Sequence, residues 1–248
     1  WCSTQQLFAF RDHISALLDI PIGDVTVVPL EIGGGFGGKG MGGVYLEPVA
    51  AVLSKKSGSA VKITMTRAEV FTGTGPTSGT EMSVKMSATS DGKLTGVKAR
   101  LVFEAGAFPG SPVAGGSRTM LGPYVIPNAY VEGLDVVTNV QKSSAYRAPG
   151  SPACAFAVET VIDELAEKVG MDPIEFRLFN AAKEGTRQPA NGPVYRKIGL
   201  IETLEAAKIP HCESVGLYVS SGFDMPSRGP QINMGTSNSF ANFTTASS

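Results

Sequence analysis

The segment that most constrains the fold is the glycine-rich stretch at residues 31–43, which reads EIGGGFGGKGMGG and follows the apolar run 25–32. Glycine costs backbone entropy, so a dense run of it indicates a chain that adopts positive φ angles or approaches another group closely. Successive backbone N–H groups without side chains suit a phosphate, an oxo group or another anion. A long flexible loop is the alternative, but the aromatic Phe36 inside the run argues against flexibility alone. We therefore expect a loop that cradles a ligand.

Composition excludes several classes of protein. The 248 residues carry a net charge of −1 without any block of basic residues, which argues against nucleic acid as a partner. No apolar run approaches the ~20 residues that span a membrane. Cys2, Cys154 and Cys212 are too far apart for a disulfide framework and fit a reducing, cytoplasmic compartment. The two histidines are isolated, so we expect no metal site built from protein ligands.

Hydrophobic periodicity predicts an α+β fold in which mixed β-sheets are flanked by helices. The clearest local signal is a hairpin, because the alternating segments 80–90 and 93–104 flank an Asp-Gly turn. The Gly-, Pro- and Ser-rich residues 106–122 are expected to form a long loop with a function. Further strands are predicted at residues 24–32, 60–66 and 130–140, and helices at 6–18, 45–56, 151–169, 172–183 and 199–208.

Polar residues mark where several of these helices should begin. Ser3 or Thr4 is expected to cap the first helix, and Ser151 to cap the helix at 151–169. Asp172 and Glu175 have the spacing of a capping box. Residues 1–208 are read as one domain. Residues 209–248 lose this periodicity and are read as an irregular tail of unknown role.

Two nucleotide-binding motifs overlap the glycine-rich stretch. The pattern GxGxxG at residues 33–38 fits the dinucleotide fingerprint, but the next predicted strand ends in Thr66-Arg67 and has no acidic residue for a ribose. Residues 33–39 also fit the start of a P-loop, but Gly40 stands where Ser or Thr must hold magnesium. Both interpretations are therefore weak.

A third interpretation depends on the order of several motifs along the chain. They are STQ at 3–5, GGGFGGK at 33–39, GPY at 122–124, IPN at 126–128, AYRAPG at 145–150, ExxxDELA at 159–166 and DPxExRxxN at 172–180. In this combination the chain resembles the molybdenum-cofactor-binding subunit of the xanthine dehydrogenase/aldehyde oxidase family, and the resemblance covers about residues 3–208. It implies hydroxylation of an aldehyde or an aromatic N-heterocycle with oxygen drawn from water.

The resemblance also implies a molybdenum–pterin cofactor and roles for individual residues. Gln5 matches a glutamine whose amide donates a hydrogen bond to an oxo ligand of molybdenum. Gly35, Phe36 and Gly37 match loop residues whose backbone lies beside the metal centre. Arg147 matches an arginine that orients the substrate, and a guanidinium fork suits a carbonyl or carboxylate. Without the resemblance, Gln5 would be read as a residue near a helix cap and Arg147 as a former of a surface ion pair.

Several positions depart from the family pattern and narrow the substrate. Gly40 stands where purine-oxidising members carry a substrate-binding glutamate, and Pro149 replaces a phenylalanine that stacks on purines. Ala148 stands where carbon monoxide dehydrogenases place a copper-binding cysteine. An aldehyde or a heteroaromatic ring other than purine is therefore expected. Arg118, in the long predicted loop, is a candidate for a second substrate contact.

The resemblance covers only part of the family's catalytic subunit. Later segments of that subunit place the general-base glutamate and most residues that hold the pterin. We therefore expect this chain to be inactive alone and to need a complementary molybdenum-binding chain, with iron–sulfur and flavin subunits to remove electrons. Exposed apolar surface where that chain docks would also allow self-association. The alternative is a non-catalytic, truncated or recombined module that keeps the fold, and a lost targeting segment before Trp1 is a further open alternative.

Overall fold

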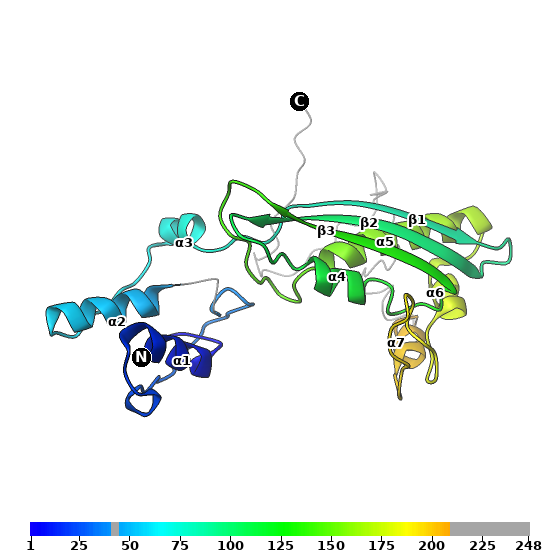
Figure 1. Ribbon diagram of the computed structural model, residues 1–248. Coiled ribbons are helices and arrows are strands. Elements are labelled where there is room, and N and C mark those ends of the chain that lie inside the picture. The colour runs from blue at the N-terminus through cyan, green and yellow to red at the C-terminus, as the bar shows by residue number, and fades with distance from the viewer. Residues whose placement is uncertain (41–44, 209–248) are drawn as a thin grey trace, which may run out of the picture.

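The computed structural model describes residues 1–40 and 45–208 of the chain. Figure 1 shows an elongated arrangement, with α1 and α2 at one end and the sheet at the other. Its elements are α1 (Leu7–Leu18), η1 (Ile22–Asp24), α2 (Leu46–Ser57), α3 (Arg67–Gly73), β1 (Thr80–Ala88), β2 (Leu94–Gly106), α4 (Val113–Thr119), β3 (Asn128–Val137), α5 (Ser151–Val169), α6 (Pro173–Asn180) and α7 (Leu200–Ala207). The five predicted helices are therefore confirmed, with ends that shift by up to a few residues.

The sheet is three-stranded in the order β1-β2-β3, with β1 antiparallel and β3 parallel to β2. This mixed sheet confirms the predicted α+β class, although the described residues form one sheet and not several. The predicted hairpin is also confirmed. Gly92 turns the chain at φ 89°, and its N–H donates to the Thr89 carbonyl at 2.9 Å. Such a positive φ is the reason that the turn uses glycine.

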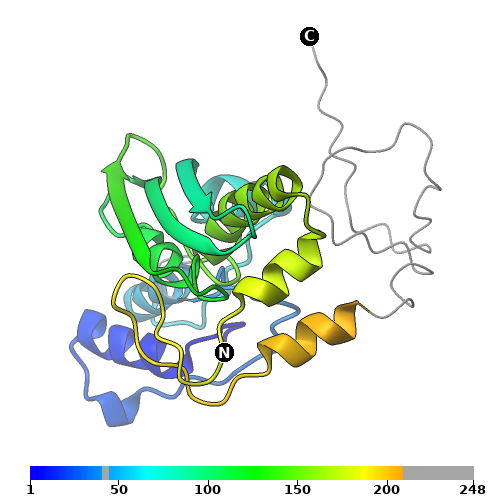
Figure 2. The same cartoon turned by 90° about the vertical axis from the view of Figure 1, so that its right-hand side faces the viewer.

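The core lies between one face of the sheet and α5, and Figure 2 shows this helix lying alongside the strands. Every second residue of β2 from Val97 to Phe103 is buried, as expected for a strand with one covered face. On α5 the buried residues recur every four positions, which places them on one side of the helix. They are Cys154, Val158, Ile162 and Ala166. Burying a large apolar side chain stabilises a fold by about 1.5–3 kcal/mol, so this layer provides most of the stability.

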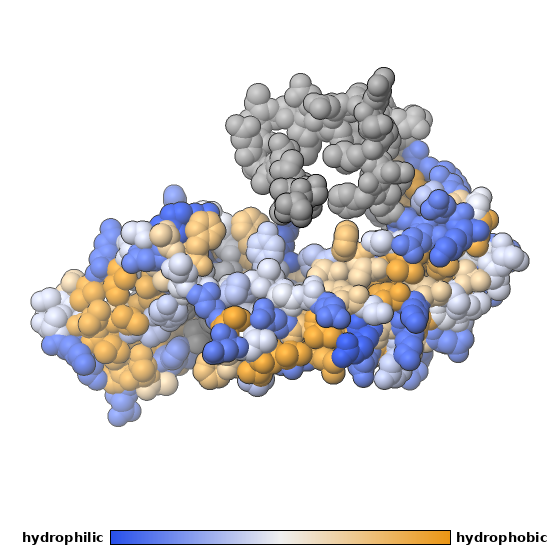
Figure 3. Space-filling view, turned by 90° about the horizontal axis from the view of Figure 1, so that it is seen from above, coloured by the Kyte–Doolittle hydropathy of each residue, from blue (hydrophilic) through white to orange (hydrophobic). Residues whose placement is uncertain are grey.

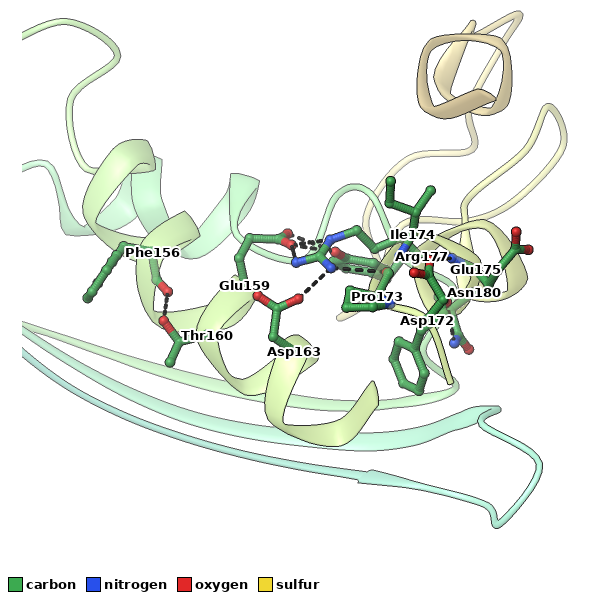
Figure 4. Close-up of polar contacts among 12 residues, drawn as sticks. Phe156, Glu159, Thr160, Asp163, Asp172, Pro173, Ile174, Glu175, Arg177 and Asn180 are labelled. Carbon is green, nitrogen blue, oxygen red and sulfur yellow. Dashed lines mark hydrogen bonds and ion pairs between the residues drawn. The ribbon is translucent and has the colours of Figure 1, made fainter. Parts of the chain in front are cut away.

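A buried ion-pair network joins α5 to α6, as Figure 4 shows. The Arg177 guanidinium donates to the Glu159 carboxylate at 2.8 Å and to Asp163 at 2.6 Å, while its side chain is only 10% exposed. The Tyr124 hydroxyl donates to Glu159 at 2.7 Å. Burial alone would lower the pKa of Arg177, but the hydrogen bond to Asp163 and the neighbouring negative charges raise it. The guanidinium therefore stays charged.

The Asn180 amide ties the end of α6 to the hairpin. Its Oδ1 accepts from the Leu94 N–H at 2.8 Å, and its Nδ2 donates to the carbonyls of Gly92 and Phe176 at 2.9 Å each. A buried amide with this many partners fixes the angle at which α6 meets the sheet. The motifs at 159–166 and 172–180 therefore contain residues that hold the fold together.

Two predicted strands are absent from the described residues. Residues 24–32 begin at the last residue of η1 and continue as extended chain, which makes only an isolated parallel bridge between Cys2 and Pro29. Residues 60–66 lead instead into α3, where Thr66 and Glu69 form a capping box. Residues 60–66 have the alternation of a strand and residues 24–32 have the β-branched, apolar character of one, but the described part of the chain offers neither a neighbouring strand to pair with. Periodicity alone cannot reveal that lack.

The long loop predicted at 106–122 contains the helix α4. Two glycines in this helix argue against it on intrinsic propensity. They are required by packing, since a Cβ on Gly116 would lie 2.5 Å from the Cys154 Sγ atom and 3.0 Å from the Gly150 carbonyl oxygen. Tertiary contact with the start of α5 therefore overrides propensity here.

Two of the three predicted caps are wrong. The residue before α1 is Gln6 and the residue before α5 is Gly150, and neither makes a side-chain cap. Ser151 is instead the first residue of its helix. Asp172 does cap α6, accepting from the N–H groups of Ile174 and Glu175 at 2.8 and 3.1 Å. In a capping box the Glu175 carboxylate would accept from the Asp172 N–H. Here it forms an ion pair with Lys208 instead.

Within the described residues, no helix has the length and apolar character needed to cross a membrane. Cys2 and Cys154 are both free thiols. The predictions for residues 209–248, including Cys212, lie outside the part of the chain that the structure describes.

Candidate functional site

The segment before α1 lies against the glycine-rich stretch and is joined to it by hydrogen bonds. The Gln5 N–H donates to the Lys39 carbonyl at 2.9 Å, and Gln5 Oε1 accepts from the N–H groups of Gly37 and Lys39 at 2.9 and 3.3 Å. A Cβ on Gly35 would lie 2.4 Å from Gln5 Cδ, so glycine is needed there to admit the side chain. The amide oxygen is thus engaged, while the amide N–H groups have no partner among the described residues.

Thr4 and Lys39 also join this segment to the glycine-rich stretch by hydrogen bonds. Thr4 is 3% exposed, and its hydroxyl donates to the Lys39 carbonyl at 3.0 Å and accepts from the Gln6 N–H at 3.1 Å. The Lys39 ammonium donates to Ser3 Oγ at 3.0 Å and to the Ile32 carbonyl. Lys39, the lone cation of the stretch, therefore closes the loop on itself. Sequence reasoning missed this bracing role, and the only signal was the pair of hydroxyls beside Gln5.

The loop that carries Arg147 meets the glycine-rich stretch directly. The Arg147 N–H donates to the Phe36 carbonyl at 2.7 Å, and a Cβ on Gly37 would lie 2.6 Å from the Ala145 carbonyl oxygen. The Arg147 guanidinium is exposed and makes no ion pair within the described residues. We call this meeting point of Gln5, residues 35–37 and Arg147 the junction. The sequence-predicted residues are therefore brought together.

Backbone strain is concentrated at the junction. Phe36, Arg147 and Ala148 have φ values of 50°, 27° and 54°, which are unusual for residues with a side chain. Each such residue costs on the order of 1–3 kcal/mol, and strain of this kind clusters at functional sites. The Phe36 ring is also 58% exposed. An exposed aromatic ring held in a strained conformation suits contact with a ligand or with another part of a larger protein.

Helix α4 lies against the loop at 147–150, and this placement bears on Arg118. A Cβ on Gly115 would lie 3.0 Å from the Pro149 carbonyl oxygen. Arg118 is exposed on α4, and its Nε donates to the Ala114 carbonyl at 3.2 Å. Arg118 therefore lies on the helix that packs against the Arg147 loop.

Gly40, the last described residue of the glycine-rich stretch, packs against Gln6. It is buried, and a Cβ there would lie 3.3 Å from the Gln6 side chain, so a larger residue would have to displace Gln6.

The donors at the junction suit an anionic or oxo-bearing group. They are the Gln5 amide N–H groups and the Arg147 guanidinium, whereas the N–H groups of Gly37 and Lys39 already donate to Gln5 Oε1. The described residues contain no cluster of His, Cys, Asp or Glu side chains that could hold a metal ion.

Sequence comparison connects this geometry to known proteins. The pattern of the family described as "Molybdopterin cofactor-binding domain" matches residues 1–181. The chain is 33% identical over 217 residues to the nicotinate dehydrogenase large molybdopterin subunit of Eubacterium barkeri, covering 86% of this chain and 51% of that protein. It is 36% identical over 213 residues to a putative xanthine dehydrogenase molybdenum-binding subunit of Escherichia coli, covering 83% of this chain and 28% of that protein. The chain thus spans about half or less of these relatives.

Solved structures with the same fold belong to related enzymes. Quinoline 2-oxidoreductase from Pseudomonas putida 86 superposes with a TM-score of 0.79 at 25% identity, covering 86% of this chain and 28% of that one. Aldehyde oxidoreductase from Desulfovibrio gigas superposes with a TM-score of 0.75 at 27% identity, covering 86% of this chain and 23% of that one.

Proposed function

Because the chain belongs to the molybdopterin cofactor-binding domain family, we propose that it is part of the catalytic subunit of a molybdenum hydroxylase. Its substrate would be an aldehyde or an aromatic N-heterocycle, oxidised with oxygen from water. The observation that carries the proposal is the junction, where Gln5, the glycine-rich stretch and Arg147 converge. We assign residues 1–208 to this cofactor-binding domain, and the convergence favours an enzyme part over a non-catalytic module.

The donor set of the junction fits one side of the molybdenum–pterin cofactor. Gln5 Oε1 is held by two backbone N–H groups, so its amide nitrogen would donate to an oxygen ligand of the metal. Gly35 and Gly37 have no Cβ, which lets the Gln5 side chain and the Ala145 backbone pack against the stretch and so brings Gln5 and the Arg147 loop beside Phe36. When bound, the cofactor supplies two-electron oxidation chemistry. The protein's part is to orient the cofactor and to exclude competing contacts.

Arg147 would position the substrate. Its backbone is fixed by the Phe36 carbonyl, while its guanidinium is free to form a forked pair with a carbonyl or carboxylate group. Gly40 and Pro149 lack the side chains with which purine-oxidising relatives bind their substrate, so a purine is not proposed. Ala148 likewise lacks the thiol needed for a copper-dependent reaction.

The rest of the enzyme would cover the end of the molecule formed by α1 and α2. Figure 3 shows apolar surface gathered at this end. Its exposed large side chains include Phe8, Leu17, Val49 and Leu53, which are 43–72% exposed. A face of this kind suits docking of the complementary molybdenum-binding part, and self-association of the isolated chain by the same face. A fall in the sedimentation coefficient on dilution would reveal that association.

Electrons removed from the substrate would leave through iron–sulfur and flavin subunits. The described residues hold only two free cysteines, which are too few to bind a cluster. Free thiols also support our placement of the protein in the cytoplasm.

Turnover of the loaded protein tests this proposal. The chain would be co-expressed with the complementary region of the nicotinate dehydrogenase subunit in a host that makes the cofactor. Dye reduction would then be followed with benzaldehyde, nicotinate and xanthine. We expect reduction with benzaldehyde or nicotinate and none with xanthine.

A matched pair of variants separates substrate binding from cofactor loading. Arg147→Ala should lower kcat/KM at least tenfold while the molybdenum content is unchanged, and Arg196→Ala is the control for loss of a positive charge. Oxidation of xanthine, or a molybdenum-loaded protein that oxidises none of the three substrates, would contradict the proposal.

A further inference from the structure

A groove lies at the end of the sheet away from the junction. It has a volume of about 940 Å³ and is lined by residues of the sheet and by residues 186–191. These residues belong to the loop that follows α6, whose path Figure 2 shows. Its floor includes Gly96 and Asn128, which are paired at the beginning of the parallel strands. The opposite end of the same strands lies beside the segment that leads to Arg147, since Gly106 packs closely on Gln141. The groove is therefore separate from the junction.

Positive charge is gathered in this groove without a counter-charge. Lys85, Lys98 and Arg187 line it, and none of its lining residues is Asp or Glu. Lys85 and Lys98 are direct partners across β1 and β2, and like charges placed opposite each other destabilise a sheet. Neither lysine forms an ion pair within the described residues.

The next pair along the same face shows the contrast. Arg100 on β2 lies opposite Glu132 on β3, and these two side chains form an ion pair at 3.3 Å. The cation there is neutralised by its neighbour in the sheet. Lys98, two residues before Arg100 on β2, and its partner Lys85 have no such neutralising neighbour. The lysine pair is therefore a local exception that the fold itself does not require.

Two of the cations are already positioned. The Lys98 ammonium lies 5.7 Å from the centre of the Tyr130 ring, and the Arg187 guanidinium donates to the Gly192 carbonyl at 3.0 Å. The wall of the groove contains backbone strain, because Ala190 and Asn191 have φ values of 55° and 61°. Cations held in place before binding lose less entropy when they bind an anion.

We propose that this groove binds a small organic molecule with two or more negative charges, either a phosphate ester or a polycarboxylate. Charge-assisted hydrogen bonds from lysine and arginine are the strong contacts for both groups. The volume of about 940 Å³ lies within the roughly 300–1,000 Å³ range of small-molecule sites. Ser87, Thr186 and Gln188 add polar groups that can orient the ligand. This site is independent of the proposed oxidation and of the molybdenum cofactor.

Calorimetric titration of the 248-residue chain with pyrophosphate and with citrate tests the inference, with acetate as the singly charged control. We expect at least one of the two multivalent anions to bind with an affinity that falls as salt is added, and acetate not to bind. Tighter binding of pyrophosphate than of citrate would indicate a ligand with phosphate groups, and the reverse a polycarboxylate. Lys85→Gln and Arg187→Gln should each weaken binding about tenfold.

Matched controls separate binding from folding. Lys56→Gln removes an exposed lysine from α2, at the other end of the molecule, and should leave binding unchanged. Lys85→Gln should also keep or raise the melting temperature without ligand, because it relieves a like-charge pair. No binding of either anion, or equal loss in Lys56→Gln, would overturn the inference. Binding of a deca-glutamate peptide alone would also overturn it, because the groove would then be a protein-docking surface.

Discussion

The two ends of the molecule are stabilised in different ways. At the sheet end, β2 and α5 bury a continuous apolar layer, and the Arg177 guanidinium has its ionic partners within the chain. At the junction end, α1 buries only Phe10 among its residues, and α2 buries none. Backbone hydrogen bonds and a few polar side chains hold the glycine-rich stretch there. The sheet end therefore finds its apolar and ionic partners within the chain. The junction end is ordered but buries few of its side chains.

This difference separates two roles among the residues that carry the family resemblance. Glu159, Asp163, Arg177 and Asn180 are engaged with one another or with the hairpin, so they hold the fold together. The junction residues present donors that have no partner within the described chain. A residue of the family motifs can therefore either hold the fold together or contact a ligand. Burial of its side chain distinguishes the first role from the second.

The largest effect should come from breaking the ion-pair network at the sheet end. Arg177→Ala would leave Asp163 and Glu159 without their partner and should lower the free energy of unfolding by about 3 kcal/mol. This is the lower end of the usual range because Glu159 is 33% exposed. Urea unfolding measures the change. The control is Arg100→Ala, which removes an exposed ion pair and should cost about 0–1 kcal/mol. Equal costs would contradict the claim that the buried network, unlike an exposed ion pair, holds the sheet end together.

A smaller effect is expected where the two loops of the junction touch. Gly37 has a φ of 97°, and an added Cβ would lie 2.6 Å from the Ala145 carbonyl oxygen. Gly37→Ala should therefore cost on the order of 1–3 kcal/mol and should separate the loops. Gly23→Ala is the control, because a Cβ there meets nothing within 4 Å. Thermal unfolding of both variants measures the difference, and a fully stable Gly37→Ala protein would disprove the contact.

Loss of the Gln5 side chain should barely change stability. It removes an exposed hydrogen-bond acceptor, which is worth about 1 kcal/mol or less. The local effect should be larger, since the N–H groups of Gly37 and Lys39 would lose the oxygen that they share. Hydrogen exchange should therefore accelerate at these two amides in Gln5→Ala, while the amides of α5 keep their protection. Unchanged exchange at both positions would mean that Gln5 does not organise the stretch.

The smallest effect is a dependence on alkaline pH to which two buried groups at the sheet end, Cys154 and Tyr124, contribute. Burial raises the pKa of the Cys154 thiol from 9.0 to about 11, and burial also raises the pKa of Tyr124. Both groups stay neutral in the folded protein while the unfolded chain ionises. Stability is therefore unaffected below pH 9 and falls between about pH 9 and 11.

Chemical unfolding across that range measures the slope. Cys154→Ala should reduce it by less than the ~1.4 kcal/mol per pH unit that one full proton allows. An identical slope in the variant would show that the thiol makes no contribution.

Sequence predicted the parts of the fold that depend on local pattern. The helices and the hairpin follow from periodicity and turn chemistry, which are properties of consecutive residues. The strands expected at 24–32 and 60–66 failed because a strand also needs a neighbour. Helix α4 was missed because contacts with Cys154 and Gly150 override the low helix propensity of its glycines. These features depend on residues far apart in the chain.

The site was predictable only through the resemblance. Spacing alone indicated an anion-cradling loop, and the order of the motifs added Gln5 and Arg147. The contact between Gly37 and Ala145 and the bracing by Thr4 required the fold. So did the lysine pair, since facing of Lys85 and Lys98 depends on the strand register.

The central claim is that the junction is one side of a molybdenum–pterin site. Its most direct test is the molybdenum and pterin content of the chain co-expressed with the complementary region of the nicotinate dehydrogenase subunit in a host that makes the cofactor, compared with Gly35→Ala and Gly23→Ala. An added Cβ at Gly35 would lie 2.4 Å from Gln5 Cδ and displace that side chain, whereas Gly23 has open space. We predict equal amounts of molybdenum and pterin in the wild type and in Gly23→Ala, and a loss of most of both in Gly35→Ala. A folded wild-type protein without either component, or the same content in all three proteins, would contradict the claim.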